Sequence, residues 1–141
     1  RSPANARGLM QLIPTTAKST ARRHGIVYRK KSDLYNAEKN IFLGSAYLED
    51  LYNQFNGNFA MATAGYNAGP HRVSKWQKRY CGNPIFWIDT IPITETRRYV
   101  RRTLFYSLIY EWQQTGKSKK LNDMLKQIPA TRNDKQRICE L

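Results

Sequence analysis

The stretch that decides the fold class is NAEKNIFLGSAYLEDLYNQF, residues 36–55. Its apolar positions recur at steps of three and four residues, which places them on one face of an α-helix. These positions are Ile41, Gly44, Leu48, Leu51, Tyr52 and Phe55. Asn36 is a suitable N-cap, because its amide oxygen can accept a backbone N–H of the first turn, and Glu38 suits the helix dipole there. The pattern predicts a long amphipathic helix that ends at Asn56-Gly57-Asn58.

The sequence on both sides of this stretch also predicts helices. Pro14 is tolerated in the first turn of a helix, and Gly25 would end that helix. Residues 59–64 are small and apolar all round, which is typical of a buried helix, and a short helix is expected over residues 71–78. No stretch alternates apolar and polar residues over a useful length. The fold class is therefore predicted to be all-α.

The C-terminal part of the chain predicts a loop, a long helix and a tail. Residues 79–93 hold Gly82 and two prolines, so we predict a loop that crosses the surface. Thr94 is expected to cap the longest helix, which Gly116 ends. The apolar side of that helix consists of Tyr99, Val100, Leu104, Leu108 and Trp112. Beyond it, residues 121–128 are predicted to form one small helix in a separable tail.

Length and composition predict a single domain. The chain has 141 residues, 40% of them hydrophobic, which is enough for one core. We assign residues 1–115 to the main domain and residues 116–141 to the tail. Arg1 is neither an initiator Met nor the start of a signal peptide, so we expect the domain to be incomplete at its N-terminus. No stretch approaches the ~20 uninterrupted apolar residues of a membrane helix, so any membrane association would come from upstream sequence.

Charge and cysteine content limit the partners. The chain has 24 Lys plus Arg against 10 Asp plus Glu, a formal net charge of +14, which favours an anionic partner. Aromatic residues make up 12%, too many for a disordered basic arm. Cys81 and Cys139 cannot form a four-thiolate site, and His24 and His71 are distant in sequence, so no metal is expected. A disulfide between the two cysteines and two free thiols are equally compatible with the sequence.

Three segments contain polar or aromatic residues that a core does not require. In the run GLMQLIP, residues 8–14, Gln11 interrupts apolar residues; its amide either bonds to backbone or meets a ligand. In the run AGYNAGP, residues 64–70, Tyr66 and Asn67 have small neighbours, which suits stacking on a sugar and hydrogen bonding to its edge. The alternative is an ordinary helix that ends at a glycine.

The third segment is IPITETRRYV, residues 91–100. Glu95 and Tyr99 are four residues apart and therefore lie on one helix face. Helix capping by Glu95 and core packing by Tyr99 are the alternatives to a role in a site. The arginines that follow are predicted to form a solvated face: Arg97, Arg98, Arg101 and Arg102.

In this order and spacing the three segments resemble the motifs of the soluble lytic transglycosylase family, lysozyme-like domains that cleave peptidoglycan. Residues 36–41 resemble the start of that family's intervening helix, and the resemblance extends from Arg1 to about Trp112. Two positions depart from the family in a minor way. Gly65 stands where alanine is frequent, and Ile13 stands where some members have methionine.

A third departure concerns catalysis. The family's single catalytic residue is a glutamate followed by a serine, and the resemblance places it just upstream of Arg1. Ser2 resembles the serine that hydrogen-bonds this glutamate. No other carboxylate matches the motif, and several are expected to be solvated or capping charges: Glu38, Glu49, Asp50 and Glu111. The chain as given is therefore expected to lack the general acid and to be inactive by itself.

The resemblance implies a reaction, a substrate and a location. The reaction cleaves the β-1,4 bond between N-acetylmuramic acid and N-acetylglucosamine, and the muramoyl 6-hydroxyl closes a 1,6-anhydro ring. No metal or cofactor is implied. Glycan strands of peptidoglycan are the implied partner, with other cell-wall enzymes as further partners, in the periplasm or cell envelope of a bacterium. The residues implied to bind substrate are Gln11, Ile13, Tyr66, Asn67, Glu95 and Tyr99.

Two other functions are compatible with the sequence. A non-catalytic basic module could bind glycan or nucleic acid, since the positive charge suits either, although nucleic acid is not the expected partner. An aromatic groove with arginines outside it would favour glycan. Arginines interleaved with stacked aromatics would favour a nucleic-acid strand. A relative of goose-type lysozyme would use water as the nucleophile and release a reducing end.

Overall fold

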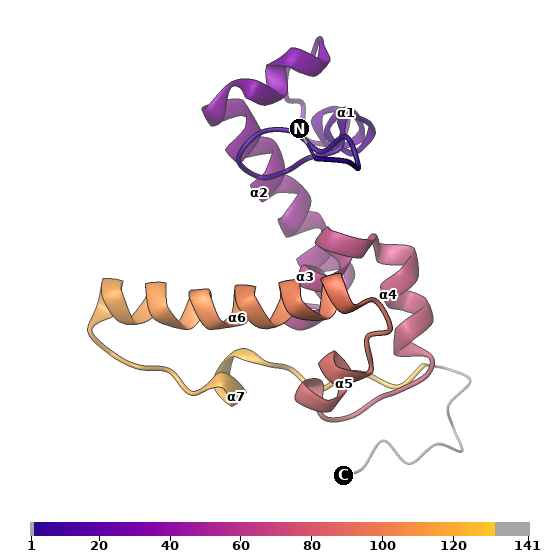
Figure 1. The fold of residues 1–141 in the computed structure, drawn as a ribbon, viewed down its shortest axis with the longest axis vertical. Helices are drawn as coiled ribbons and strands as arrows, with labels where there is room; N and C mark the ends of the chain where they lie inside the picture. Colours follow the sequence, from indigo (N-terminus) through magenta and orange to yellow (C-terminus); the bar gives the residue numbers. More distant parts are fainter. Residues whose placement is uncertain (1, 132–141) are drawn as a thin grey trace. The chain divides into compact units, whose positions relative to one another are not determined.

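The computed structural model describes residues 2–131, and the chain divides into two compact units, residues 1–50 and residues 51–141 (Figure 1). The division falls inside a helix, between Asp50 and Leu51. Helices make up the regular structure of the described residues, and the only strand-like pairs among them are two isolated bridges. The all-α prediction is confirmed. The assignment of residues 1–115 and 116–141 as domain and tail stays a prediction.

The first unit contains α1 (Pro14–Arg23), the short 3-10 helix η1 (Lys31–Tyr35) and the first part of α2 (Ala37–Gln54). Pro14 begins α1, and the chain leaves it through Gly25, whose φ of 65° is in the left-handed region that favours glycine. Both expected ends of this helix are confirmed. The apolar side chains buried in this unit include Leu12, Ala17, Ala21, Leu34 and Leu43.

Helix α2 has the predicted extent, but its buried face is displaced by one residue at the N-terminal end. Asn36 accepts a hydrogen bond from the backbone N–H of Lys39 at 2.9 Å, as expected of the cap. Ile41, placed on the apolar face by the sequence pattern, is 46% exposed, whereas Asn40 is completely buried. An apolar pattern cannot identify a polar side chain that is buried because its hydrogen bonds are satisfied.

The second unit is built around α3 (Phe59–Ala68), which packs against α4 (Pro70–Gln77) and α6 (Thr94–Thr115). Residues 60–65 are buried, which confirms the buried helix expected from their small apolar side chains. The side-chain oxygen of Asn58 caps α3 by accepting the N–H of Met61 at 3.1 Å. The predicted end of α6 at Gly116 is also confirmed, with φ of 68°.

The loop predicted over residues 79–93 is wrong, because it contains α5 (Pro84–Thr90), which packs against α6. Proline at the first position of a helix has a suitable φ and lacks only an N–H that would have no partner there. The Asn83 side chain caps the helix by accepting the N–H groups of Ile85 and Phe86. Trp87 is completely buried, so this segment belongs to the core and does not merely cross the surface.

Two details after α5 also differ from prediction. Thr94 was expected to cap α6, but it is the first helical residue, and the N-cap position, Ile93, makes no side-chain cap bond. The small tail helix α7 is limited to Leu121–Met124, and the backbone already has an extended conformation at Leu125. After α6 the chain turns back (Figure 1), and Ile128 exchanges two backbone hydrogen bonds with Gly82, at 2.8 and 2.9 Å. This pairing removes Ile128 from any helix and buries its side chain.

Candidate functional site

The first motif forms a tight loop in the first unit. Arg7 and Leu12 pair through two backbone hydrogen bonds of 3.0 Å, and the intervening residues turn back on themselves. Gly8 has a φ of 72° and Gln11 a φ of 49°, so both adopt left-handed backbone conformations. A Cβ atom on Gly8 would lie 2.2 Å from the carbonyl oxygen of Leu34, which only glycine avoids.

Asn40 holds this loop against α2. Its side-chain amide donates to the carbonyl oxygens of Arg7 and Leu34, both at 3.0 Å, and its oxygen accepts the N–H of Met10 at 2.6 Å. Gly44, one turn further along α2, makes room for Met10, because a Cβ there would lie 2.5 Å from the Met10 Cβ. The loop is therefore fixed by a buried amide and a glycine of α2. The sequence pattern did not predict that Asn40 and Gly44 fix the loop. For Asn40 the available signal was a polar residue one position before Ile41, where the apolar series begins.

The residues of this unit implied to bind substrate lie on or beside the loop. The side chain of Gln11 is exposed and donates to the carbonyl oxygen of Gly8 at 2.8 Å, which is the backbone-bonded alternative considered for it. Ile13 is 42% exposed, immediately before α1. Ser2 is half-buried, and its hydroxyl oxygen accepts the N–H of Ala6 at 3.1 Å. Binding roles for Gln11 and Ile13 and an orienting role for Ser2 stay predictions.

The other two motifs meet in the second unit. Tyr66 and Asn67 lie in the last turn of α3, before Gly69, and both are half-buried. The Asn67 amide nitrogen donates to a carboxylate oxygen of Glu95, Oε1, at 3.4 Å. Its amide oxygen accepts the hydroxyl of Thr96 at 2.6 Å. The end of α3 is thereby joined to the first turn of α6.

Tyr99 lies one turn after Glu95 on α6. Burial raises the pKa of its phenol, and a hydrogen bond with Thr103 acts in the opposite direction without cancelling the effect. Tyr99 is therefore a neutral, half-buried hydroxyl near neutral pH, and Glu95 is an exposed carboxylate at the start of the helix. This arrangement agrees with the helical spacing expected of the pair. Thr96, which the sequence analysis missed, is only 1% exposed.

The structure thus brings together Asn67 and Glu95, which are 28 residues apart in sequence. Because Ser2, Gln11 and Ile13 belong to the first unit, their convergence with Tyr66, Asn67, Glu95 and Tyr99 on one cleft stays a prediction. Thr96 could have been found only by knowing that α3 ends beside the start of α6, since threonine alone carries no signal.

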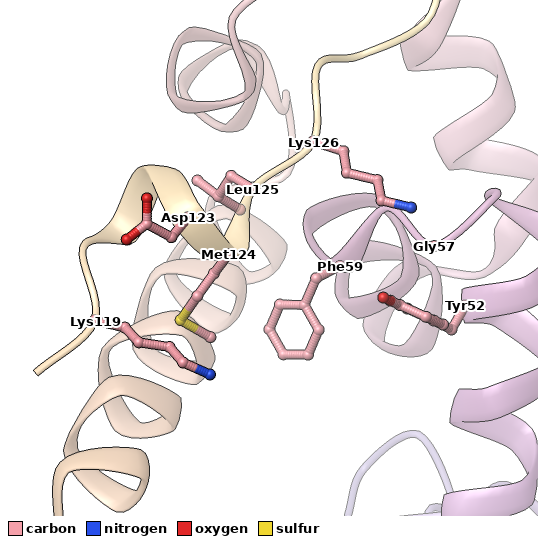
Figure 2. A pocket seen from close by; sticks show the side chains of 8 residues that line it. All are labelled: Tyr52, Gly57, Phe59, Lys119, Asp123, Met124, Leu125 and Lys126. Atoms are coloured by element: carbon pink, nitrogen blue, oxygen red, sulfur yellow. The ribbon is translucent and has the colours of Figure 1, made fainter. Parts of the chain in front are cut away.

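A cavity of about 410 Å³ lies in the second unit at the other end of α3. Figure 2 shows Phe59, Met124 and Tyr52 around this space, with Lys126 at its edge. The Lys126 ammonium donates to the carbonyl oxygen of Asn56 at 3.1 Å. Because Phe59 begins α3 and Asn67 lies in its last turn, the cavity is not part of the Asn67–Glu95 site.

Among residues 2–131, no group of three or more His, Cys, Asp and Glu side chains could hold a metal ion, and no helix is long and apolar enough to cross a membrane. Cys81 is not a free cysteine, and Cys139 lies outside the described residues. Of the carboxylates considered above, Asp50 binds Arg23 and His24, and Glu111 binds Lys119.

The family model of the transglycosylase SLT domain matches residues 1–85, which carry the first two motifs and the start of α2. The chain belongs to this family. The SLT domain is 42% identical over 113 residues to a putative soluble lytic murein transglycosylase of Haemophilus influenzae, covering 79% of this chain and 19% of that protein. It is 41% identical over 113 residues to the soluble lytic murein transglycosylase of Salmonella typhimurium, covering 78% of this chain and 18% of that protein.

Solved structures agree with the assignment. An inactive glutamate-to-glutamine mutant of lytic transglycosylase Slt from Pseudomonas aeruginosa matches with a TM-score of 0.79 and 45% identity, over 86% of this chain and 20% of that chain. The 70 kDa soluble lytic transglycosylase of Escherichia coli matches with a TM-score of 0.78 and 34% identity, over 89% of this chain and 20% of that chain. The SLT domain described here spans about a fifth of the length of the relatives it matches.

Proposed function

We propose that this SLT domain binds glycan strands of peptidoglycan and acts in a lytic transglycosylase, cleaving the bond between N-acetylmuramic acid and N-acetylglucosamine with formation of a 1,6-anhydromuramoyl product. The observation that carries the proposal is the contact of Asn67 with Glu95 and Thr96 beside Tyr66. An aromatic side chain next to donor and acceptor groups suits a sugar, which has apolar faces and polar edges. Membership of the SLT family supports the same substrate.

The proposed reaction needs one carboxyl group. In protonated form it gives a proton to the leaving glycosidic oxygen, and as a carboxylate it then takes a proton from the muramoyl 6-hydroxyl. Because that hydroxyl attacks the anomeric carbon, the second carboxylate of ordinary glycosidases is not required. We propose that this group is the glutamate of a Glu-Ser motif just upstream of Arg1, with Ser2 as its orienting partner. The inactive glutamate-to-glutamine mutant of the Pseudomonas aeruginosa relative supports a glutamate in this role.

The remaining site residues would bind and orient the strand. Tyr66 would line the cleft beside the glutamate, Asn67 and Gln11 would hydrogen-bond the sugars, and Glu95, Tyr99 and Ile13 would complete the wall. The net charge of +14 suits a strand that carries lactyl-peptide carboxylates. We further propose that the protein acts in the periplasm or cell envelope. A relative, the 70 kDa soluble lytic transglycosylase, has been solved in complex with bulgecin A.

The test compares two proteins on purified sacculi: the 141-residue chain and a version extended upstream in its gene. Mass spectrometry of the released fragments should find 1,6-anhydromuramoyl products from the extended protein only, since general acid catalysis contributes about 10²–10⁴ in rate. The matched control is the extended protein with its upstream glutamate changed to glutamine.

Three other results would refute parts of the proposal. Anhydro products from the 141-residue chain would place the reaction on a carboxylate within it, and Glu95→Gln would then be the first variant to examine. Reducing ends from the extended protein would make water the nucleophile, as in a lysozyme. Glycan binding without cleavage by either protein would define a binding module.

A further inference from the structure

A buried threonine is hydrogen-bonded to the Asn67 side chain. Thr96 is 1% exposed in the first turn of α6, and its hydroxyl oxygen is 2.6 Å from the amide oxygen of Asn67. This hydrogen bond is short and partly buried, which makes it costlier to lose than an exposed one. The contact between Asn67 and Glu95 is 3.4 Å long and exposed, so it contributes less. Thr96 is therefore the principal group that holds the Asn67 amide.

The donors and acceptors around Asn67 fix which way the amide faces. A carboxylate oxygen accepts hydrogen bonds, and the amide group that faces Glu95 Oε1 is the NH₂. The amide oxygen then faces Thr96, whose hydroxyl can donate its single proton to it. The reversed amide would place its oxygen against the carboxylate and its NH₂ against the Thr96 hydroxyl. The Glu95 contact therefore selects the orientation, and the Thr96 hydroxyl, which can donate or accept, donates to the amide oxygen in that orientation.

We propose that Thr96 is a positioning residue, which holds the Asn67 amide in the orientation that Glu95 selects, so that its NH₂ group and not its oxygen is presented to the ligand. One N–H of that group is directed to Glu95, and the proposal assigns the second as the donor to a substrate. The ligand atom at this position is then an acceptor, such as the carbonyl oxygen of an acetamido group or a sugar hydroxyl oxygen. The choice of a sugar ligand rests on the proposed function; the locked amide does not.

The experiment uses the 141-residue chain labelled with ¹⁵N, and follows the side-chain NH₂ signals of Asn67 by NMR. Thr96→Val removes the hydroxyl at nearly constant volume, whereas Thr96→Ser keeps it. Thr63→Val is the matched control: Thr63 is a buried threonine of α3 whose hydroxyl has no hydrogen-bond partner among the described residues. A tetramer of N-acetylglucosamine is then titrated into each protein.

Two results are expected. The two NH₂ protons of Asn67, which are inequivalent in any primary amide because rotation about the C–N bond is slow, should keep their chemical shifts in Thr96→Ser and Thr63→Val and should move toward those of an exposed asparagine in Thr96→Val. The Kd for the tetramer should rise about five- to tenfold in Thr96→Val, which corresponds to the loss of roughly one hydrogen bond. In an Asn67→Ala background, Thr96→Val should add little, because a positioning residue acts through the residue it positions.

The proposal is wrong if the Asn67 signals of Thr96→Val match those of the unmodified chain, whatever the affinity for glycan. It is also wrong if Thr63→Val weakens binding as much as Thr96→Val, since any buried threonine would then matter equally. Failure of the unmodified chain to bind the tetramer would count against the proposed glycan function, while the NH₂ signals would still decide the role of Thr96. If Thr96→Val does not fold, Thr96→Ala takes its place with the same readouts.

Discussion

Replacing Asn40 by alanine should loosen the loop that carries Gln11. The side chain makes three hydrogen bonds, to the backbone of Arg7, Met10 and Leu34. Each is worth about 1 kcal/mol, and a backbone group that loses a buried partner costs about 1–3 kcal/mol. Because two of the three bonds are partly accessible to water, we expect Asn40→Ala to lower the free energy of unfolding by about 2–4 kcal/mol.

The matched control lies one turn earlier on the same helix. Asn36 is exposed and makes a single capping bond, to the N–H of Lys39, so Asn36→Ala should cost only about 1 kcal/mol. Urea unfolding followed by circular dichroism measures both losses, and hydrogen exchange of the Met10 amide reports on the loop itself. Equal losses for the two variants, with unchanged exchange at Met10, would refute the role assigned to Asn40.

Three further predictions concern stability. Gly44→Ala should lower the Tm, because crowding against Met10 costs about 1–3 kcal/mol and outweighs the ~1 kcal/mol gain in helix propensity; a higher Tm would contradict the contact. Partial burial raises the pKa of Asp50, but hydrogen bonds from Arg23 and His24 outweigh it and leave the pKa below its ordinary value. The stabilisation by ionised Asp50 is therefore present at neutral pH and is lost as the pH falls below about 4. Asp50→Asn should lower the free energy of unfolding, measured with urea, by about 0.5–1 kcal/mol at pH 7 and by less in acid. A pH-independent loss would contradict this assignment. Asn83→Ala removes the cap of α5 and should cost about 1 kcal/mol, measured by tryptophan fluorescence during unfolding, with exposed Asn53→Ala as a control that should cost less.

The sequence predicted the helices whose signals are local. Pro14, Asn36 and Gly116 each mark a helix end by a property of the residue itself, and each end lies where it was expected. The α5 helix was missed because Pro84 was counted as a breaker, although the preceding Asn83 makes it the first residue of a capped helix. The order Asn83-Pro84 favoured a helix start, but the prediction was based on the glycine and proline content of residues 79–93, which favoured a loop.

Parts of the candidate site that depend on packing could not be predicted in the same way. Asn67 and Glu95 were selected for their chemistry, and their contact followed only from the assumption that motifs converge. Thr96 and Asn40 contribute through partners 29 and 30 residues distant, respectively. No pattern within one helix contains such a partner, so these roles require the tertiary structure.

The Asn58 side chain gives the boundaries of this domain a practical meaning for protein engineering. It caps the start of α3 and donates to the carbonyl oxygens of Lys126 and Gln127, at 3.1 and 3.3 Å, while it is itself buried. A gene fragment cut at residue 85, where the family match ends, or at 115 would remove both acceptors and leave this amide without them inside the protein. Fragments of this chain made for expression, and hybrids in which its C-terminal tail is exchanged with that of a relative, should therefore keep residues 116–129 together with α3. The opposite end of α3 carries Tyr66 and Asn67.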